Sequence, residues 1–200
     1  MKANKIIIGV DEVGRGPIAG PVAVGAFVFL DKNAQRVFRG AKESKQLSER
    51  KREEWFEKIL KAKSAGRIDF KVSFESEKVI DFKGLSFAIK RALGNSLRAL
   101  KINSKQAMVL LDGGLKAPAI YEDQQTIIKG DEKKLVIALA SICAKVLRDR
   151  RMINLSKKHV EYGFEKHKGY GTAKHYSAIK SLGLLPCHRR SFLKNNKKGQ

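Results

Sequence analysis

The apolar residues of the chain gather into short runs that predict β-strands. The runs at 5–11 and 21–30 are rich in isoleucine and valine, and the run at 67–75 alternates between apolar and polar positions. A fourth apolar run occupies 106–112, and a fifth, at 126–131, ends like it on an acid. Because the first three runs follow one another with only one helical segment between them, they predict the antiparallel start of a β-sheet.

Four further segments carry apolar residues at helical spacing: 48–65, 85–100, about 132–157 and 172–182. Ser48 and Thr172 are candidate N-caps for the first and the last of these helices, and Gly183 is a candidate stop signal. The order of strands, followed by mixed strands and helices, predicts an α/β fold in which helices flank a mixed β-sheet.

The length and charge of the chain narrow the class of protein. Its 200 residues suit one domain with a small C-terminal appendage, and 42% hydrophobic residues allow a buried core. Lysine and arginine total 42 against 20 acidic residues, which gives a net charge of +22. Residues 151–200 hold 12 of the basic residues and only two acids, so nearly half of the excess lies there. Such an excess indicates nucleic acid as the partner, against the alternative of a lysine-rich composition that serves solubility.

Other features bear on the compartment. No apolar stretch of about 18 residues is present, so neither a transmembrane helix nor a membrane partner is expected. The N-terminal apolar run is too short for a signal peptide. Cys143 and Cys187 do not have the spacing of a disulfide framework or a zinc site. We therefore expect a cytoplasmic protein, and we expect it to be a monomer.

Acidic residues close three of the apolar runs: Asp11 with Glu12, Asp112, and Asp131. Strand ends at one edge of a sheet lie close together, and carboxylates that meet there repel one another unless cations lie between them. Oxygen ligands suit Mg²⁺ or Mn²⁺ rather than zinc, and together with a polyanionic partner they predict phosphoryl transfer with one or two metal ions. The alternative for each acid alone is a strand end or a helix cap, and Asp131, just before a helix, fits a cap.

The first two acids raise a geometric question. Asp11 and Glu12 are adjacent, so in a regular strand their side chains point to opposite faces. Both reach one site if the strand ends or bends there. The glycine- and proline-rich segment that follows, GRGPIAG at 14–20, favours such an end.

Several motifs of the chain resemble, in order, those of the ribonuclease HII family. They are DEVGRGPIAGPV at 11–22, ESKQLSERKR at 43–52, LLDGG at 110–114, KGDEKKLVIALASICAKVLRDR at 129–150, HKGYGTAKH at 167–175 and HRRSF at 188–192. Together they span nearly the whole chain. The departures are few: Glu43 stands where the family usually has aspartate, and Leu139 and Cys143 differ as packing residues.

The resemblance implies a ribonuclease H-like catalytic domain at 1–150 and a basic helical C-terminal extension at 151–200, expected as one integrated unit. It implies cleavage of RNA in RNA–DNA hybrids and at single ribonucleotides in duplex DNA, with 5′-phosphate and 3′-hydroxyl products. The four acids of the family map onto residues that would bind Mn²⁺ or Mg²⁺, as two ions when substrate is bound: Asp11, Glu12, Asp112 and Asp131.

An enzyme for hybrids must distinguish ribose from deoxyribose by the 2′-hydroxyl. Gly14, Arg15 and Gly16 directly follow two of the acids, and glycines let backbone N–H and C=O groups approach a ligand closely. Arg15 can pair with a phosphate. A tight turn with a solvated arginine explains the same residues equally well from the sequence alone, and the resemblance favours recognition.

Other substrate contacts follow in the same way. Tyr170 lies between two glycines near lysines, where its ring can stack on a sugar or base, although a core tyrosine is the commoner case. The resemblance implies that it packs on the nucleotide after the ribonucleotide. The expected phosphate neighbours are Lys45, Ser141, Lys145 and Arg148, against solvated helix faces for the basic ones. The histidines lack metal-ligand spacing and are expected as structural or phosphate contacts: His159, His167, His175 and His188.

Two rival functions stay open at this point. Another nuclease or an integrase with the same fold would share the acids, but it has no reason to carry the GRG segment and the tyrosine motif. A non-enzymatic RNA-binding protein, such as a ribosomal component, would need the basic surface but not the acids. A metal-dependent cleavage assay on an RNA–DNA hybrid distinguishes both rival functions from the activity that the resemblance implies.

Overall fold

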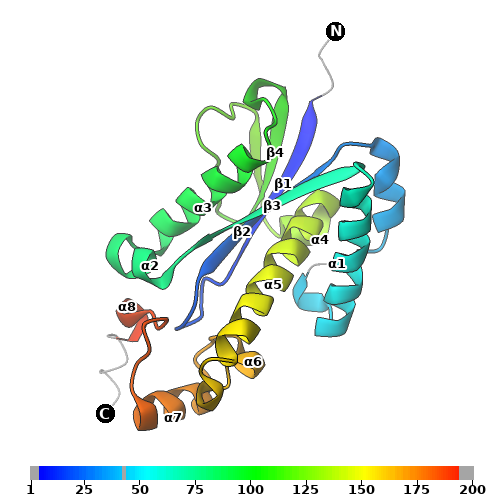
Figure 1. Cartoon of the computed structure of the whole chain (residues 1–200). Coiled ribbons are helices and arrows are strands. Elements are labelled where there is room, and N and C mark those ends of the chain that lie inside the picture. The colour runs from blue at the N-terminus through cyan, green and yellow to red at the C-terminus, as the bar shows by residue number, and fades with distance from the viewer. Residues whose placement is uncertain (1–4, 42–43, 194–200) are drawn as a thin grey trace.

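A five-stranded sheet forms the centre of the computed structural model, which describes residues 5–41 and 44–193 (Figure 1). The strands lie in the order β3-β2-β1-β4-β5. Their bounds are β1 Ile6–Val13, β2 Val22–Phe29, β3 Ile68–Glu75, β4 Ala107–Asp112 and β5 Gln124–Ile127. β1, β2 and β3 pair antiparallel, whereas β1, β4 and β5 pair parallel. The predicted mixed sheet and its antiparallel start are confirmed.

Parallel pairing decides where the acids emerge. Val10 of β1 lies opposite Leu111 of β4, so the next residues of both strands, Asp11 and Asp112, come out at the same end of the sheet. The sequence expectation that these two runs deliver acids to one edge is therefore confirmed.

Helices cover both faces of the sheet (Figure 1). α3 packs on one face, and α5, with α1 beside it, packs on the other. α5 comes very close to the sheet, since a Cβ atom at Gly9 would lie 2.4 Å from the Val136 backbone. The α-helices are α1 Glu49–Ser64, α2 Glu77–Lys83, α3 Leu85–Ala99, α4 Gly130–Lys133, α5 Leu135–Ser156, α6 Phe164–His167, α7 Ala173–Leu182 and α8 Arg190–Leu193. Short 3₁₀ helices occupy Lys32–Phe38, Ser44–Gln46, Ser104–Gln106 and Val160–Tyr162.

The predicted helix ends are mostly correct. Ser48 accepts a hydrogen bond from the N–H of Lys51, and Thr172 accepts one from the N–H of His175, as N-caps do. The helix expected over about 132–157 is confirmed as α5, Leu135–Ser156, but it begins later than expected, because Lys134 is extended (φ −127°, ψ 113°) and separates α4 from α5. The strand expected to end at Asp131 is also wrong: β5 stops at Ile127, and Asp131 lies in α4. The helix α2 was not expected.

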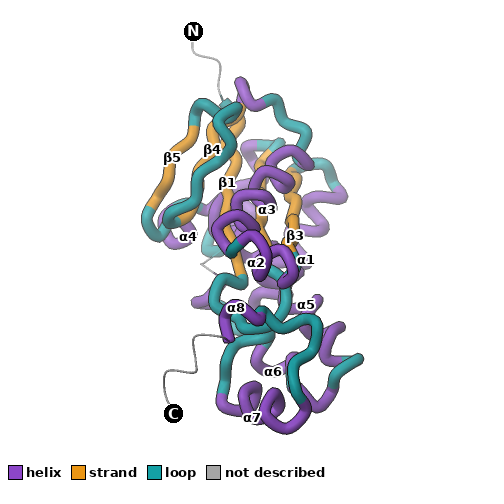
Figure 2. The backbone as a smooth tube through the Cα atoms, turned by 90° about the vertical axis from the view of Figure 1, so that its left-hand side faces the viewer, coloured by secondary structure: helices purple, strands orange, loops and turns teal. Residues whose placement is uncertain are grey.

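The C-terminal part continues from α5. Figure 2 shows α6, α7 and α8 below the sheet, at the far end of α5. A separate apolar cluster there joins Ala19 to Met152, Tyr162 and Phe164, and a bridge pairs Ala19 with His188. α5 runs across residue 150, so the division expected there stays a prediction. Within the described residues, no helix is both long and apolar enough to cross a membrane.

Candidate active site

Asp11 lies on the face of the sheet that α5 covers, and it is only 4% exposed. Its Oδ1 atom accepts a hydrogen bond of 2.7 Å from the N–H of Glu12, and its side chain also bonds to Ser141 of α5. Burial, reinforced by the negative charges of the other three acids, raises the pKa of Asp11 to about 8. Asp11 therefore lies where too little positive charge surrounds the carboxyl group to stabilise its ionised form.

Glu12 points to the other face, because β1 does not end at Asp11. The strand stays paired with β2 as far as Val13, so the expected strand end is wrong and the two acids alternate. Glu12 Oε1 accepts a hydrogen bond of 2.9 Å from Arg15. Glu12 Oε2 is buried and has no hydrogen-bond partner among the described residues. Burial raises the pKa of Glu12 despite the opposing effect of Arg15.

Asp112 and Asp131 reach the same place from β4 and α4. Asp112 Oδ1 accepts a hydrogen bond of 2.6 Å from the N–H of Gly130, which ties the start of α4 to the end of β4. Asp131 is 5% exposed, and its charge acts on Asp11. The charge of Asp112 acts on both Asp11 and Glu12. The charges of the other three predicted acids therefore all act on Asp11, although the Glu12 side chain starts from the other face of β1.

The donor set fits a hard divalent cation. It consists of carboxylate oxygens, the ligands that Mg²⁺ and Mn²⁺ prefer. The unpartnered oxygen of Glu12 and the raised pKa of Asp11 both indicate missing positive charge. Within residues 5–41 and 44–193, no three acidic, histidine or cysteine side chains already stand as a ligand set. The hydrogen bonds from Arg15 and from the backbone N–H groups use one oxygen each of Asp11, Glu12 and Asp112, so the second oxygen of each carboxylate could still bind an ion.

The glycine-rich segment 14–20, here named the reading loop, begins beside these acids. Gly14 has φ +96°, and a Cβ atom there would lie 2.3 Å from Nε of Arg148, so glycine is required. Arg15 and Gly16 are exposed. A Cβ atom at Gly16 would lie 3.7 Å from the Tyr170 ring, an ordinary contact. The two predicted recognition elements are thus neighbours.

Tyr170 belongs to a second loop, residues 168–171, here named the tyrosine loop. Its ring is 42% exposed. The carbonyl oxygen of Gly169 accepts hydrogen bonds from the N–H groups of Ile18 (2.9 Å) and Ala19 (3.2 Å), which fasten the two loops together. The structure places the tyrosine at the surface rather than in the core.

Arg148 is a correction. It is fully buried, and its guanidinium donates hydrogen bonds to the carbonyl oxygens of Pro21 (2.9 Å), Lys168 (3.0 Å) and Ala19 (3.4 Å). It therefore holds the two loops instead of facing a phosphate. The error arose because arginine within LRDR on a helix is typical of a solvated face.

The other expected phosphate neighbours differ in position. Ser141 is 1% exposed, and its Oγ lies 2.7 Å from Oγ of Ser44, so it stands behind Asp11. Lys145 is partly buried and donates to Asp149 at 2.8 Å, and burial lowers its pKa. Lys45 is exposed. Glu43 lies outside the described residues.

Sequence reasoning missed Arg189 and underused two histidines. Arg189 is fully buried against the reading loop, yet nothing in HRRSF distinguishes it from exposed Arg190. Nδ1 of His175 lies 2.9 Å from the carbonyl oxygen of Tyr170 and must donate to it, which leaves Nε2 to accept from His188 at 3.1 Å. Both rings are buried, and burial lowers the pKa of His175 to about 4. These two histidines are structural supports of the tyrosine loop.

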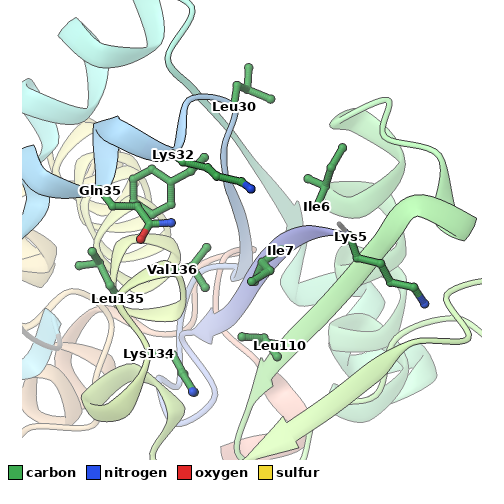
Figure 3. A pocket seen from close by; sticks show the side chains of 11 residues that line it. Lys5, Ile6, Ile7, Leu30, Lys32, Gln35, Leu110, Lys134, Leu135 and Val136 are labelled. Carbon is green, nitrogen blue, oxygen red and sulfur yellow. The ribbon is translucent and has the colours of Figure 1, made fainter. Parts of the chain in front are cut away.

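A cavity of about 340 Å³ lies elsewhere, where β1 begins and β2 ends (Figure 3). Its lining combines Ile7, Leu30 and Leu135 with Lys32 and Lys134. It contains none of the four acids and none of the predicted substrate contacts, so the candidate site stays at the other end of β1.

The family model of ribonuclease HII matches residues 8–195. The chain belongs to the ribonuclease HII family. Ribonuclease HII of Caldicellulosiruptor bescii is 44% identical over 96% of this chain and 88% of that protein. Ribonuclease HII of Clostridioides difficile is 42% identical over 97% of this chain and 72% of that protein.

Solved structures agree. Ribonuclease HII from Archaeoglobus fulgidus, determined in a complex with PCNA, matches with a TM-score of 0.72 at 27% identity over 92% of this chain and 93% of that one. The ribonuclease H-like fold is therefore confirmed. As a ribonuclease HII, the chain is an endonuclease that acts on RNA in RNA–DNA hybrids, which removes the integrase and ribosomal-protein alternatives.

Proposed function

We propose that the acid cluster around Asp11 is the centre that cuts RNA in RNA–DNA hybrids and at single ribonucleotides within duplex DNA. The observation that carries the proposal is a set of buried carboxyl groups with too little positive charge around them: Glu12 Oε2 lacks a partner among the described residues, and burial together with the neighbouring acids raises the pKa of Asp11 to about 8, so that a cation is needed to favour its ionised form. Buried charge without a partner is costly, so a site that retains it has a cationic ligand as its natural complement.

Four carboxylates would hold the ions, as two Mg²⁺ or Mn²⁺ with substrate bound: Asp11, Glu12, Asp112 and Asp131. When bound, such ions lower the pKa of water and neutralise charge on the scissile phosphate. Asp11 would be the central residue of this set, because the charges of the other three acids all act on its carboxyl group. Ser141 and the N–H of Glu12 keep the Asp11 carboxylate oriented.

The reading loop and the tyrosine loop next to these acids select the ribonucleotide as the cleavage site. The exposed backbone of Arg15 and Gly16 stands next to the Tyr170 ring, so a ribose read by the backbone lies within reach of the ring. The phenol ring then stacks on the following nucleotide, a contact worth about 1–3 kcal/mol in comparable cases. This arrangement supports a cut at the ribonucleotide itself, which leaves 5′-phosphate and 3′-hydroxyl ends.

Positive charge beside the reading loop offers a path for the substrate backbone. A cavity of about 450 Å³ there is lined by Arg15, Lys90 and Lys116. The net charge of +22 supports the same partner, a polyanionic duplex. A monomer acting in the cytoplasm completes the proposal.

The test is cleavage of a DNA duplex that contains one ribonucleotide, with Mg²⁺, with Mn²⁺ or with chelator. We expect cuts at the ribonucleotide with either metal, none with chelator, and none in the all-DNA duplex. The 5′ ends should be ligatable after cleavage, which confirms the phosphate. Cleavage that persists in chelator, or that is equal on the all-DNA duplex, would refute the assignment.

A further inference from the structure

One buried side chain fixes the whole reading loop. Arg189 donates hydrogen bonds from Nη2 to the carbonyl oxygen of Gly14 (2.7 Å), from Nη1 to that of Arg15 (3.0 Å) and from Nε to that of Gly20 (2.9 Å). Its own N–H donates to the carbonyl oxygen of Ile18 at 2.8 Å. Each donor group of its guanidinium thus ends on loop backbone, and the side chain is fully buried.

These bonds determine which way the loop peptides face. In a trans peptide the C=O group and the following N–H group point in opposite directions, and the described residues contain no cis peptide. Since the carbonyls of Gly14 and Arg15 turn inward to Arg189, the N–H groups of Arg15 and Gly16 turn outward. Both residues are exposed, and neither N–H donates to an acceptor within the described part of the chain.

We infer that Arg189 is a positioning residue for ribose recognition, which aims the N–H groups of Arg15 and Gly16 at the substrate without touching it. The inference rests on the proposed function. It also refines that function: the loop presents N–H donors, while its Gly14 and Arg15 carbonyls accept hydrogen bonds from Arg189. The complementary group on the nucleic acid is an oxygen acceptor that only the ribonucleotide supplies, the ribose 2′-oxygen.

The guanidinium group is specifically required. Three carbonyl oxygens at residues 14, 15 and 20 are met by a planar fork with separate N–H groups, whereas the single ammonium of lysine is a compact point charge. Arg190, the next residue, offers a matched control because it is exposed. The same arginine-to-lysine change at both positions preserves net charge, but only Arg189 makes the loop contacts, in a buried place that also lies over the Phe192 ring.

The experiment compares Arg189→Lys with Arg190→Lys. Affinity in chelator is measured for a duplex with one ribonucleotide and for the matched all-DNA duplex. We expect Arg189→Lys to lose about tenfold in the preference for the ribonucleotide, the effect of roughly one or two misplaced hydrogen bonds. Affinity for the all-DNA duplex and the rise in melting temperature on adding Mn²⁺ should stay as in the parent protein, since the acids are untouched. Arg190→Lys should change none of these.

Equal weakening on both duplexes, or an unchanged preference, would overturn the inference. If Arg189→Lys does not fold, the unmodified protein still decides the question by amide NMR. The Arg15 and Gly16 N–H signals should shift with the ribonucleotide duplex and not with all-DNA; a duplex with a 2′-deoxy-2′-fluoro residue separates the 2′-oxygen from the phosphate as the acceptor. Amides that do not respond overturn the inference, whereas failure of the parent protein to cut any hybrid with metal overturns the proposed function instead.

Discussion

Two neighbouring regions of this protein bury charge in opposite ways. Around Asp11, carboxylates lie within one another's field, and one oxygen of Glu12 has no partner among the described residues. Beside them Arg148 and Arg189, together named the arginine clamp, are fully buried, and each guanidinium nitrogen donates a hydrogen bond to a backbone carbonyl. Burial lowers the pKa of both arginines too, but their nitrogens all have hydrogen-bond partners. An unpartnered buried oxygen suits a region that must accept a ligand, and hydrogen-bonded buried nitrogens suit one that must keep its shape.

The largest effect should come from the acid region. Asp112→Asn removes one negative charge but keeps an oxygen that can accept the hydrogen bond from Gly130. We expect cleavage to fall by about 1,000-fold or more, because metal-assisted stabilisation contributes several kcal/mol. The melting temperature without metal should not fall, since a repulsive charge is gone. Near-normal activity in this variant would place Asp112 outside the site.

A substitution in the arginine clamp should instead lower the stability of the folded protein. Arg148→Met leaves three buried carbonyl groups short of a donor, so we expect unfolding free energy to fall by about 3–5 kcal/mol. Lys157→Met, a change at the exposed C-cap residue of the same helix, should cost no more than about 0.5 kcal/mol. Denaturant unfolding measures both. If the two variants are equally stable, the clamp does not hold the loops.

Acid should weaken the support of the tyrosine loop. The pKa of His175 is about 4 in the folded protein and near 6.5 when unfolded, so the unfolded chain binds the extra proton first as pH falls. Stability is therefore full above pH 6.5 and is lost progressively towards pH 4, by about 3 kcal/mol. Burial lowers the pKa of His188 as well and acts in the same direction.

Melting curves between pH 7 and pH 4 test this, with His175→Gln and His159→Gln as the pair of variants. The first variant should flatten the pH dependence. The second removes a partly exposed ring whose charge acts on His188, so it should change the pH dependence much less than the first. Identical slopes for all three proteins would show that His175 does not titrate as described.

The smallest effect should be on the preference of the enzyme between two substrates. Tyr170→Ala removes a stacking ring worth about 1–3 kcal/mol, and Tyr170→Phe should keep most activity if stacking is the working contact. The loss should be greater on an embedded ribonucleotide than on a continuous hybrid, because only the first has a deoxyribose after the ribonucleotide. Equal losses on the two substrates would assign Tyr170 a general role and remove the contrast with the acids.

The sequence predicts the parts of this fold that depend on local pattern. The strands and the caps at Ser48 and Thr172 follow from apolar period and from residue type next to a helix start. The prediction placed Asp131 at the end of a strand instead of in a helix. It failed because Lys129 is left-handed (φ 54°) and Lys134 is extended, and a lysine in the sequence does not predict either backbone conformation.

The candidate site divides in the same way. The four acids were visible because each interrupts an apolar run, whereas the arginine clamp was not. Arg148 and Arg189 look like any surface arginine in a chain with 42 basic residues. Their burial depends on carbonyl groups far away along the chain, which local pattern does not encode.

Because Arg189 is far from the reading loop along the chain, the ribosome synthesises it much later than the loop. Arg189 bonds to residues that precede it by 169 to 175 positions. At about 5–20 residues per second, roughly 10–30 s of translation pass between the appearance of the reading loop and that of its holder. A nascent chain therefore carries all four acids before the loop beside them can take its final shape. A chain released before Arg189 is translated would therefore contain all four acids but not the residue that positions the reading loop.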